Sequence, residues 1–111
     1  MSGIEELEGD ALQAVLATES RQVLVDFWSP WCAPCRTMRP HLRRLAEERE
    51  VDWRFVAVNA ESQPAVAQSF QVRALPTLIL FEDGAESFRF SGATTMGAIV
   101  DKLNELSVSS S

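Results

Sequence analysis

Residues 27–36 read Phe27-Trp28-Ser29-Pro30-Trp31-Cys32-Ala33-Pro34-Cys35-Arg36, and they decide the fold of this chain. The stretch contains the only two cysteines among 111 residues, three positions apart. An apolar run at residues 23–28 precedes them, and a helical pattern of apolar side chains follows to about residue 49. A strand therefore leads the pair to the first turn of a helix, where unpaired backbone N–H groups stabilise a thiolate.

Two cysteines this close together allow four interpretations. A structural zinc site needs four ligands, but the chain has no second cysteine pair and only one histidine, His41, which we expect at the surface. A structural disulfide would close a loop too short to restrain the unfolded chain strongly. Two inert buried cysteines would not require a strand-to-helix turn. A reversible dithiol–disulfide pair suits both the turn and the preceding tryptophan.

The motif Trp31-Cys32-Ala33-Pro34-Cys35 resembles the active site of the thioredoxin family. The agreement extends over residues 4–107, nearly the whole chain. Its further anchors are Asp26-Phe27-Trp28, Pro40, Leu75-Pro76-Thr77 and Gly92-Ala93. The resemblance implies a protein-disulfide reductase that carries electrons by dithiol–disulfide exchange, with disulfide-containing proteins and a thioredoxin reductase as partners.

The pattern of apolar residues predicts an α/β protein. Strands are expected at residues 4–7, 23–28, 53–58, 77–81 and 87–90. Helices are expected after Asp10, after the cysteine motif, around 62–70, and from Thr94 or Thr95 to residue 106. Helices between strands favour parallel pairing, and Asp83-Gly84 signals a hairpin. Together with the resemblance, this predicts the thioredoxin fold, a mixed five-stranded sheet flanked by four helices on both faces. We expect one domain over residues 1–111, with 107–111 as a disordered polar tail.

Charge and composition bear on partners and location. The net charge of −6 argues against nucleic-acid or anionic-membrane partners. No apolar targeting segment follows Met1, and no apolar run could span a bilayer. We therefore expect a cytoplasmic protein. We also expect a monomer, without cofactor or metal.

Asp26 is the one charged side chain in the apolar run 23–28. An ionised carboxylate there is costly unless it is paired. One interpretation is a local bend that exposes it. The other is a buried acid whose pKa is raised by desolvation and which exchanges protons with the cysteines. The resemblance favours the second, with Cys32 as nucleophile, Cys35 as resolving cysteine and Asp26 assisting proton transfer at Cys35.

Three positions depart from the common family pattern. Ala33 replaces a glycine, Ser91 replaces an apolar residue, and Ala57 replaces a lysine that accompanies the buried acid. Arg54 lies on the same predicted strand as Ala57, but its odd spacing turns it to the other face. Unless a distant arginine folds over Asp26, we expect this acid to hold its proton more tightly than in lysine-bearing relatives.

The resemblance also implies a flat apolar docking surface for substrates beside the cysteines. A cis Leu75–Pro76 bond would leave the backbone of Leu75 free to pair with an extended substrate segment. The residues expected on this surface are Trp31, Ala33, Pro34, Leu75, Pro76, Gly92 and Ala93.

Two other functions remain open at this point. The same fold serves disulfide oxidases and isomerases, usually with a different residue pair between the cysteines. It also serves as a binding module that clamps a partner whatever its redox state, and a Cys32→Ser, Cys35→Ser double variant would separate that case from a redox enzyme.

Overall fold

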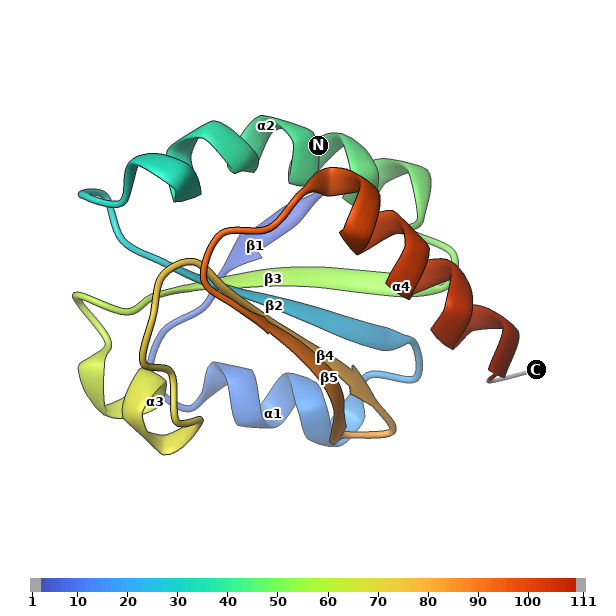
Figure 1. Ribbon diagram of the computed structural model, residues 1–111. Helices are drawn as coiled ribbons and strands as arrows, with labels where there is room; N and C mark the ends of the chain where they lie inside the picture. Colours follow the sequence, from blue (N-terminus) through green and yellow to red (C-terminus); the bar gives the residue numbers. More distant parts are fainter. Residues whose placement is uncertain (1–2, 110–111) are drawn as a thin grey trace.

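Residues 3–109, which the computed structural model describes, contain the predicted order of five strands and four helices (Figure 1). The elements are β1 (Ile4–Glu6), α1 (Ala11–Thr18), β2 (Gln22–Trp28), α2 (Ala33–Glu48), β3 (Trp53–Asn59), α3 (Pro64–Ser69), β4 (Thr77–Glu82), β5 (Ala85–Ser91) and α4 (Met96–Ser109). Helix α4 continues three residues beyond the predicted end at 106. The expected tail is therefore partly helical, and its residues 110 and 111 lie outside the described residues.

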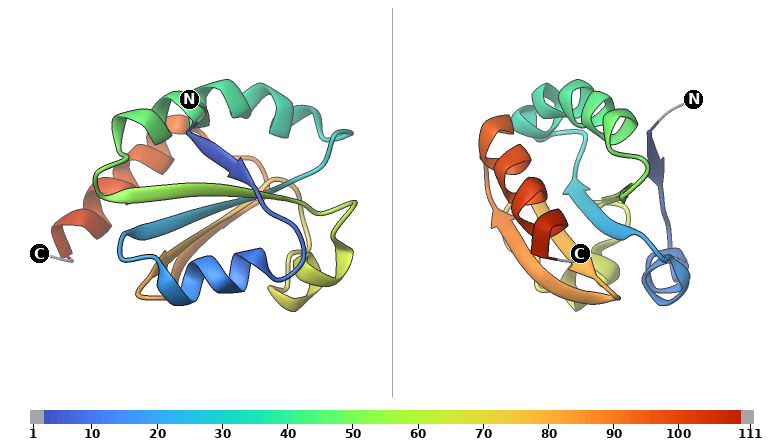
Figure 2. Two further views of the ribbon diagram at one scale, coloured as in Figure 1. Left: turned by 180° about the vertical axis from the view of Figure 1, so that it is seen from behind. Right: turned by 90° about the vertical axis from the view of Figure 1, so that its right-hand side faces the viewer.

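The strands form one mixed sheet in the order β1-β3-β2-β4-β5. Strand β3 pairs in parallel with β1 and β2, whereas β4 is antiparallel to both β2 and β5. Helices α2 and α4 cover one face of the sheet, and α1 and α3 cover the other (Figures 1 and 2). The thioredoxin fold expected from the sequence is confirmed. Strand β2 is apolar almost throughout because it is central and both its faces are covered.

Two apolar cores fill the space on either side of the sheet. Alternation along β2 turns Leu24 toward α2 and α4, and turns Val23, Val25 and Phe27 toward α1 and α3. Asp26 follows Leu24 by two residues and so points to the α2 side. The acid therefore lies beneath the helix that begins with the cysteine motif.

The predicted turns and caps are only partly as expected. Asp83 and Gly84 both have positive φ, 52° and 80°, as a two-residue hairpin with the twist of its strands requires. Thr95 caps α4, since its Oγ1 accepts the Ala98 N–H at 3.1 Å. Asp10 stands at the start of α1, but its side chain makes no capping hydrogen bond.

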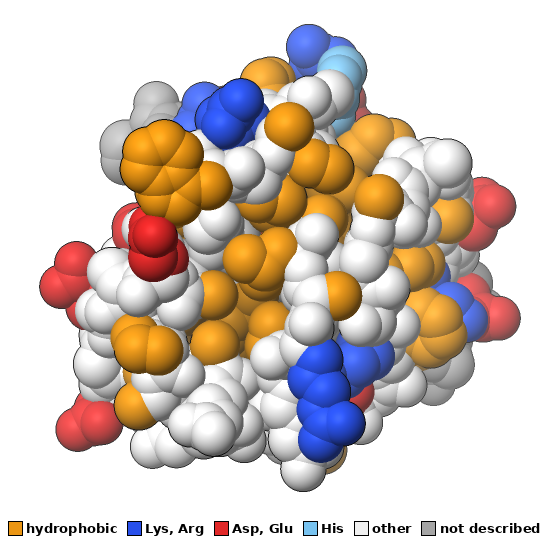
Figure 3. Space-filling view, turned by 60° about the vertical axis from the view of Figure 1, so that its left-hand side comes forward, with side chains coloured by type: hydrophobic (Ala, Val, Ile, Leu, Met, Phe, Trp, Pro, Cys, Tyr) orange, Lys and Arg blue, Asp and Glu red, His pale blue; other side chains and the backbone are white. Residues whose placement is uncertain are grey.

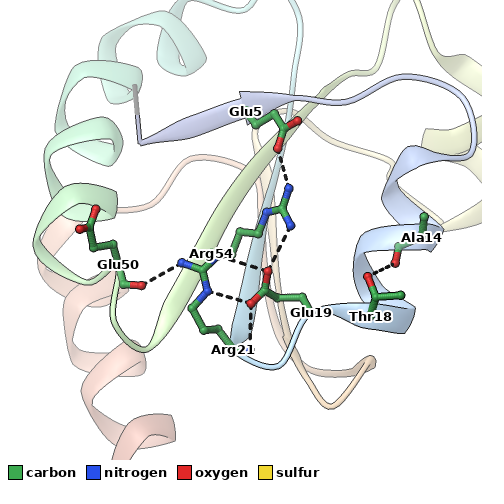
Figure 4. A network of polar contacts seen from close by, with 7 residues as sticks. All are labelled: Glu5, Ala14, Thr18, Glu19, Arg21, Glu50 and Arg54. Carbon is green, nitrogen blue, oxygen red and sulfur yellow. Dashed lines mark hydrogen bonds and ion pairs between the residues drawn. The ribbon is translucent and has the colours of Figure 1, made fainter. Parts of the chain in front are cut away.

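Charged side chains form a network around Arg54 (Figure 4). Arg54 lies three residues before Ala57, the neighbour of Asp26, so it faces the opposite side of the sheet from Asp26. Arg54 of β3 lies between Glu5, at 2.6 Å, and Glu19, at 3.1 Å. Arg21 also binds Glu19, at 2.8 Å. These hydrogen bonds, led by that of Arg21 and opposed by burial, lower the pKa of Glu19 from 4.5 to about 2. Arg54 is thus engaged away from Asp26, as its spacing predicted.

Candidate active site

The cysteine pair occupies the turn between β2 and α2. Cys32 is the residue immediately before the helix, and its Sγ accepts the backbone N–H of Cys35 at 3.2 Å. Pro34 lies in the first helical turn, where its missing N–H costs little. A disulfide joins the two cysteines. Cys32 is half-buried and Cys35 is 3% exposed, so the sulfur at the helix start is the one nearer solvent.

Asp26 is buried, with 2% of its surface exposed, so no local bend brings it to solvent. In the sheet it lies between Ala57 of β3 and Leu78 of β4, neither of which carries a charge. Burial raises the pKa of the Asp26 carboxyl from 3.8 to about 6, and nearby Arg39 opposes this rise. The pKa of Asp26 is therefore shifted upward, as expected from the sequence, and desolvation is the main cause.

Arg39 is a distant arginine that lies over Asp26, the exception that the sequence analysis allowed. Its Nη2 lies 3.2 Å from Asp26 Oδ2, so an arginine from α2 does fold over the acid. The expectation of an Asp26 without a cation is wrong. The reason is that α2 packs across β2, and neighbours along β3 alone do not determine what covers the carboxyl. Oδ1 of Asp26 has no hydrogen-bond partner among the described residues.

Glu6 and Trp28 complete the surroundings of Arg39. The Arg39 guanidinium carbon lies 4.9 Å from the centre of the Trp28 ring, close enough for a cation–π interaction. The Trp28 indole N–H binds the Glu6 carboxylate, at 2.9 Å from Oε2. Glu6 Oε1 in turn lies 4.0 Å from Arg39 Nη1. Residues of β1, β2 and α2 thus form one polar cluster beside the cysteines.

The loops at the same end of the sheet carry the other predicted site residues. The Leu75–Pro76 bond is cis, as predicted. Thr77 pairs with Phe27, so Pro76 lies at the end of the sheet from which the cysteine turn leaves. The Gly92 N–H binds the Pro76 carbonyl at 2.8 Å, which brings the β5–α4 loop to the same place. Pro76 itself is buried.

An apolar surface surrounds the cysteine turn, and Figure 3 shows hydrophobic side chains gathered on this face. Ala33, Pro34 and Ala93 line a common hollow of about 450 Å³. Trp31 is 78% exposed, and its indole N–H binds Glu61 Oε2 at 3.0 Å. The structure therefore brings the predicted docking residues to one end of the molecule, and adds Glu61 as an anchor of Trp31.

Comparison with known proteins identifies the family. The Thioredoxin family model matches residues 3–105. The chain belongs to the thioredoxin family. It is 38% identical over 89 residues to thioredoxin from Mycobacterium tuberculosis, covering 80% of this chain and 77% of that protein. It is 40% identical over 83 residues to thioredoxin 1 from Synechococcus elongatus, covering 72% and 78%.

Two solved structures share the fold. A mutant thioredoxin from Halobacterium salinarum superposes with a TM-score of 0.84 at 27% identity, covering 95% of this chain and 93% of that one. A chain from a study of thiol resolution in a yeast mitochondrial 1-Cys peroxiredoxin through the glutathione and thioredoxin systems gives 0.85 at 27% identity, covering 95% and 99%.

Family membership and the cysteine pair establish the chemistry. The protein is a thiol–disulfide oxidoreductase with protein-disulfide reductase activity, and disulfide substrates and a thioredoxin reductase are its partners. Among the described residues, no three His, Cys, Asp or Glu side chains gather in a way that could hold a metal ion. No helix within residues 3–109 has the length and apolar character needed to cross a membrane.

Sequence reasoning missed three residues of this thioredoxin site. Arg39 follows Cys35 by four residues, a spacing that places both on one helical face and was a usable signal. Glu6 had no signal, because it meets Trp28 of β2 and Arg39 of α2 only through the tertiary fold. Glu61 had none either, since it lies in an irregular loop after β3.

Proposed function

We propose that Cys32 is the nucleophile of protein-disulfide reduction and Cys35 the resolving cysteine. The Cys32 thiolate attacks one sulfur of a substrate disulfide, which breaks the substrate S–S bond and releases one substrate thiolate. Cys32 and the other substrate sulfur then share a mixed disulfide. The greater exposure of Cys32 and its place at the start of α2 are the observations that support this assignment.

Asp26 acts as base in the second step. It accepts the proton of the Cys35 thiol, and the Cys35 thiolate attacks Cys32 Sγ. The mixed disulfide breaks, the second substrate sulfur leaves as a thiolate that takes up a proton, and the Cys32–Cys35 disulfide remains. The substrate disulfide has gained an electron pair, which a thioredoxin reductase must return to the protein. A folded-state pKa of about 6 supports this role, because the carboxyl is mostly ionised at neutral pH yet can hold a proton.

Substrates dock on the apolar surface around the cysteine turn. The exposed indole of Trp31, held by Glu61, provides a rigid apolar contact. The half-buried Leu75 offers its backbone to an extended segment beside the cysteine turn. Ala33, Pro34, Gly92 and Ala93 complete the surface. Ser91 is exposed beside it and is a candidate for altering substrate preference.

The remaining assignments concern the whole protein. The 111 residues act as one thioredoxin domain, as a cytoplasmic monomer without nucleic-acid or membrane partners. The net charge of −6 supports the absence of polyanionic partners.

Trapping of the mixed disulfide tests the two cysteine roles. Cys35→Ser is expected to accumulate a covalent complex with a disulfide-bonded substrate such as insulin, because the second step is blocked. Cys32→Ser is expected to accumulate none, and the double Cys32→Ser, Cys35→Ser variant serves as the control. A complex formed by Cys32→Ser and not by Cys35→Ser would reverse the assignment.

A further inference from the structure

The positive charge beside Asp26 is carried by the helix that carries the resolving cysteine. Arg39 lies four residues after Cys35 on α2, so both side chains project from one helical face. They line one surface cavity of about 260 Å³ together with Trp28, Arg36 and Pro40. From this position the guanidinium reaches across to β2, where Nη2 lies 3.2 Å from Asp26 Oδ2.

Packing sets the direction of the Arg39 side chain. Only 19% of it is exposed. Its guanidinium lies over the Trp28 ring, and Glu6 attracts its other terminal nitrogen from β1. The hydrogen bond from the Trp28 indole to Glu6 ties these two neighbours together. A side chain enclosed in this way loses less freedom in pairing with Asp26 than an exposed arginine would.

We propose that Arg39 is a positioning residue for the resolving step, and that its guanidinium supplies the positive charge beside Asp26 that Ala57 cannot. The inference rests on the base role proposed above for Asp26. In that role Asp26 must be ionised before the Cys35 thiol can give up its proton. Arg39 favours the ionised carboxylate through its positive charge, with Nη2 lying 3.2 Å from Oδ2.

The charges that face Asp26 act in opposite senses. Arg39 of α2 favours ionisation, whereas burial and Glu6 of β1 oppose it. The neighbours on β3 and β4 are Ala57 and Leu78, which contribute no charge. Arg36 also lines the cavity, but its Nη1 binds the Pro30 carbonyl at 2.7 Å. Among these groups, Arg39 is the cation paired with the carboxylate.

Variants of Arg39 separate its charge from its shape. Arg39→Met keeps a long side chain without the charge, Arg39→Gln keeps polarity without the charge, and Arg39→Lys keeps the charge. Arg44→Met is the matched control, because Arg44 is an exposed arginine of the same helix.

Two measurements are made on each variant. The Asp26 carboxyl is titrated by carbon NMR. The reduced protein is also mixed with Ellman's aromatic disulfide, whose first and second thiolate releases report attack by Cys32 and resolution by Cys35.

The uncharged variants should move the Asp26 titration upward by about 1 unit or more, the size of effect an adjacent opposite charge has. The pH midpoint of the second thiolate release should rise with it. At pH ~7 that release should slow by roughly 2- to 10-fold, while the first is unchanged, because a smaller fraction of Asp26 is ionised. Arg39→Lys should restore most of the rate, and Arg44→Met should match the unaltered protein.

An Asp26 titration left in place by both Arg39→Met and Arg39→Gln would overturn the inference. So would a second release slowed equally by Arg39→Lys and Arg39→Met, since shape and not charge would then matter. Asp26→Asn distinguishes failure of the proposed base role of Asp26 from failure of the inference about Arg39. If that variant resolves as fast as the unaltered protein, Asp26 is not the base, and the role of Arg39 in resolution falls with it. If Asp26→Asn is slow and the Arg39 variants are not, the inference alone fails.

Discussion

Asp26 of β2 lies opposite Ala57 of β3 in the parallel register, and Ala57 is completely buried. A methyl group therefore stands beside the carboxyl in the sheet, and it carries no charge. The carboxyl is nevertheless paired, because Arg39 reaches it from the helix layer above the sheet. The cation beside Asp26 thus comes from α2 and not from the neighbouring strand.

Ala57→Lys should lower the pKa of Asp26 below its present value of about 6, since a second cation would then face the carboxyl. Ala57 is completely buried in the core, so the longer side chain should also cost about 1–3 kcal/mol of unfolding free energy. Carbon NMR titration measures the first effect and urea unfolding the second. Ala57→Met is the control for size, and it should destabilise without lowering the pKa. An unchanged pKa in Ala57→Lys would contradict this prediction.

Asp26→Asn should stabilise the protein at neutral and higher pH. The folded-state pKa of about 6 exceeds the ordinary value of 3.8, so the native state binds the proton more tightly than the unfolded state does. Stability contributed by that proton is present below pH ~4 and is lost as the pH rises through about 6. Asparagine cannot ionise and escapes this loss, which is about 1–3 kcal/mol after allowance for an unpaired Arg39. Urea unfolding at pH ~4 and pH ~8 checks the sign, and an advantage that does not grow with pH would refute it.

Glu19→Gln should show the opposite pH dependence. The pKa of Glu19 is lowered to about 2, chiefly by its hydrogen bond with Arg21, so its contribution is present above pH ~4.5 and is lost as the pH falls toward 2. The side chain is 11% exposed, and we expect a cost of about 1–3 kcal/mol at neutral pH. That cost should shrink in acid. Glu48→Gln, an exposed position on α2, should leave urea unfolding unchanged at both pH values.

The strands were the most predictable part of the fold. The strands predicted at 23–28, 53–58 and 77–81 agree with β2, β3 and β4 except for one terminal residue each. They agree closely because a continuous apolar run is typical of a buried strand. The ends of α4 were less certain. Thr95 was recognisable as a cap, but a polar sequence does not reveal whether the last turns are helical, and the helix continues to Ser109.

The candidate site was predictable where its residues are close in sequence. Cys32, Cys35 and the turn between them follow from the motif. Asp26 was recognisable because a carboxylate inside an apolar run is costly. Its partner Arg39 was not identified, since the contact depends on how α2 lies across β2. Sequence spacing places Arg39 on the face of Cys35, but it does not give the reach of the guanidinium.

Glu6→Gln should lower the pKa of Asp26, in the opposite direction to removal of Arg39. The Glu6 carboxylate raises the pKa of Asp26 through its negative charge, and it lies 4.0 Å from the arginine that lowers it. Glutamine keeps an oxygen that can accept the Trp28 indole N–H but carries no charge. Glu6 is 40% exposed, so solvent screens its charge and the shift should be less than about one unit.

Glu5→Gln is the matched control for this prediction. Glu5 precedes Glu6 on β1, and its carboxylate binds Arg54 in the network away from Asp26. The same loss of negative charge at position 5 should leave the Asp26 titration where it is, whereas at position 6 it should move the titration downward. Carbon NMR of the Asp26 carboxyl in both variants compares them directly. Equal shifts would mean that Asp26 responds to the net charge of the protein and not to the Glu6–Arg39–Asp26 arrangement, and an upward shift in Glu6→Gln would mean that Glu6 acts mainly by holding Arg39 in place.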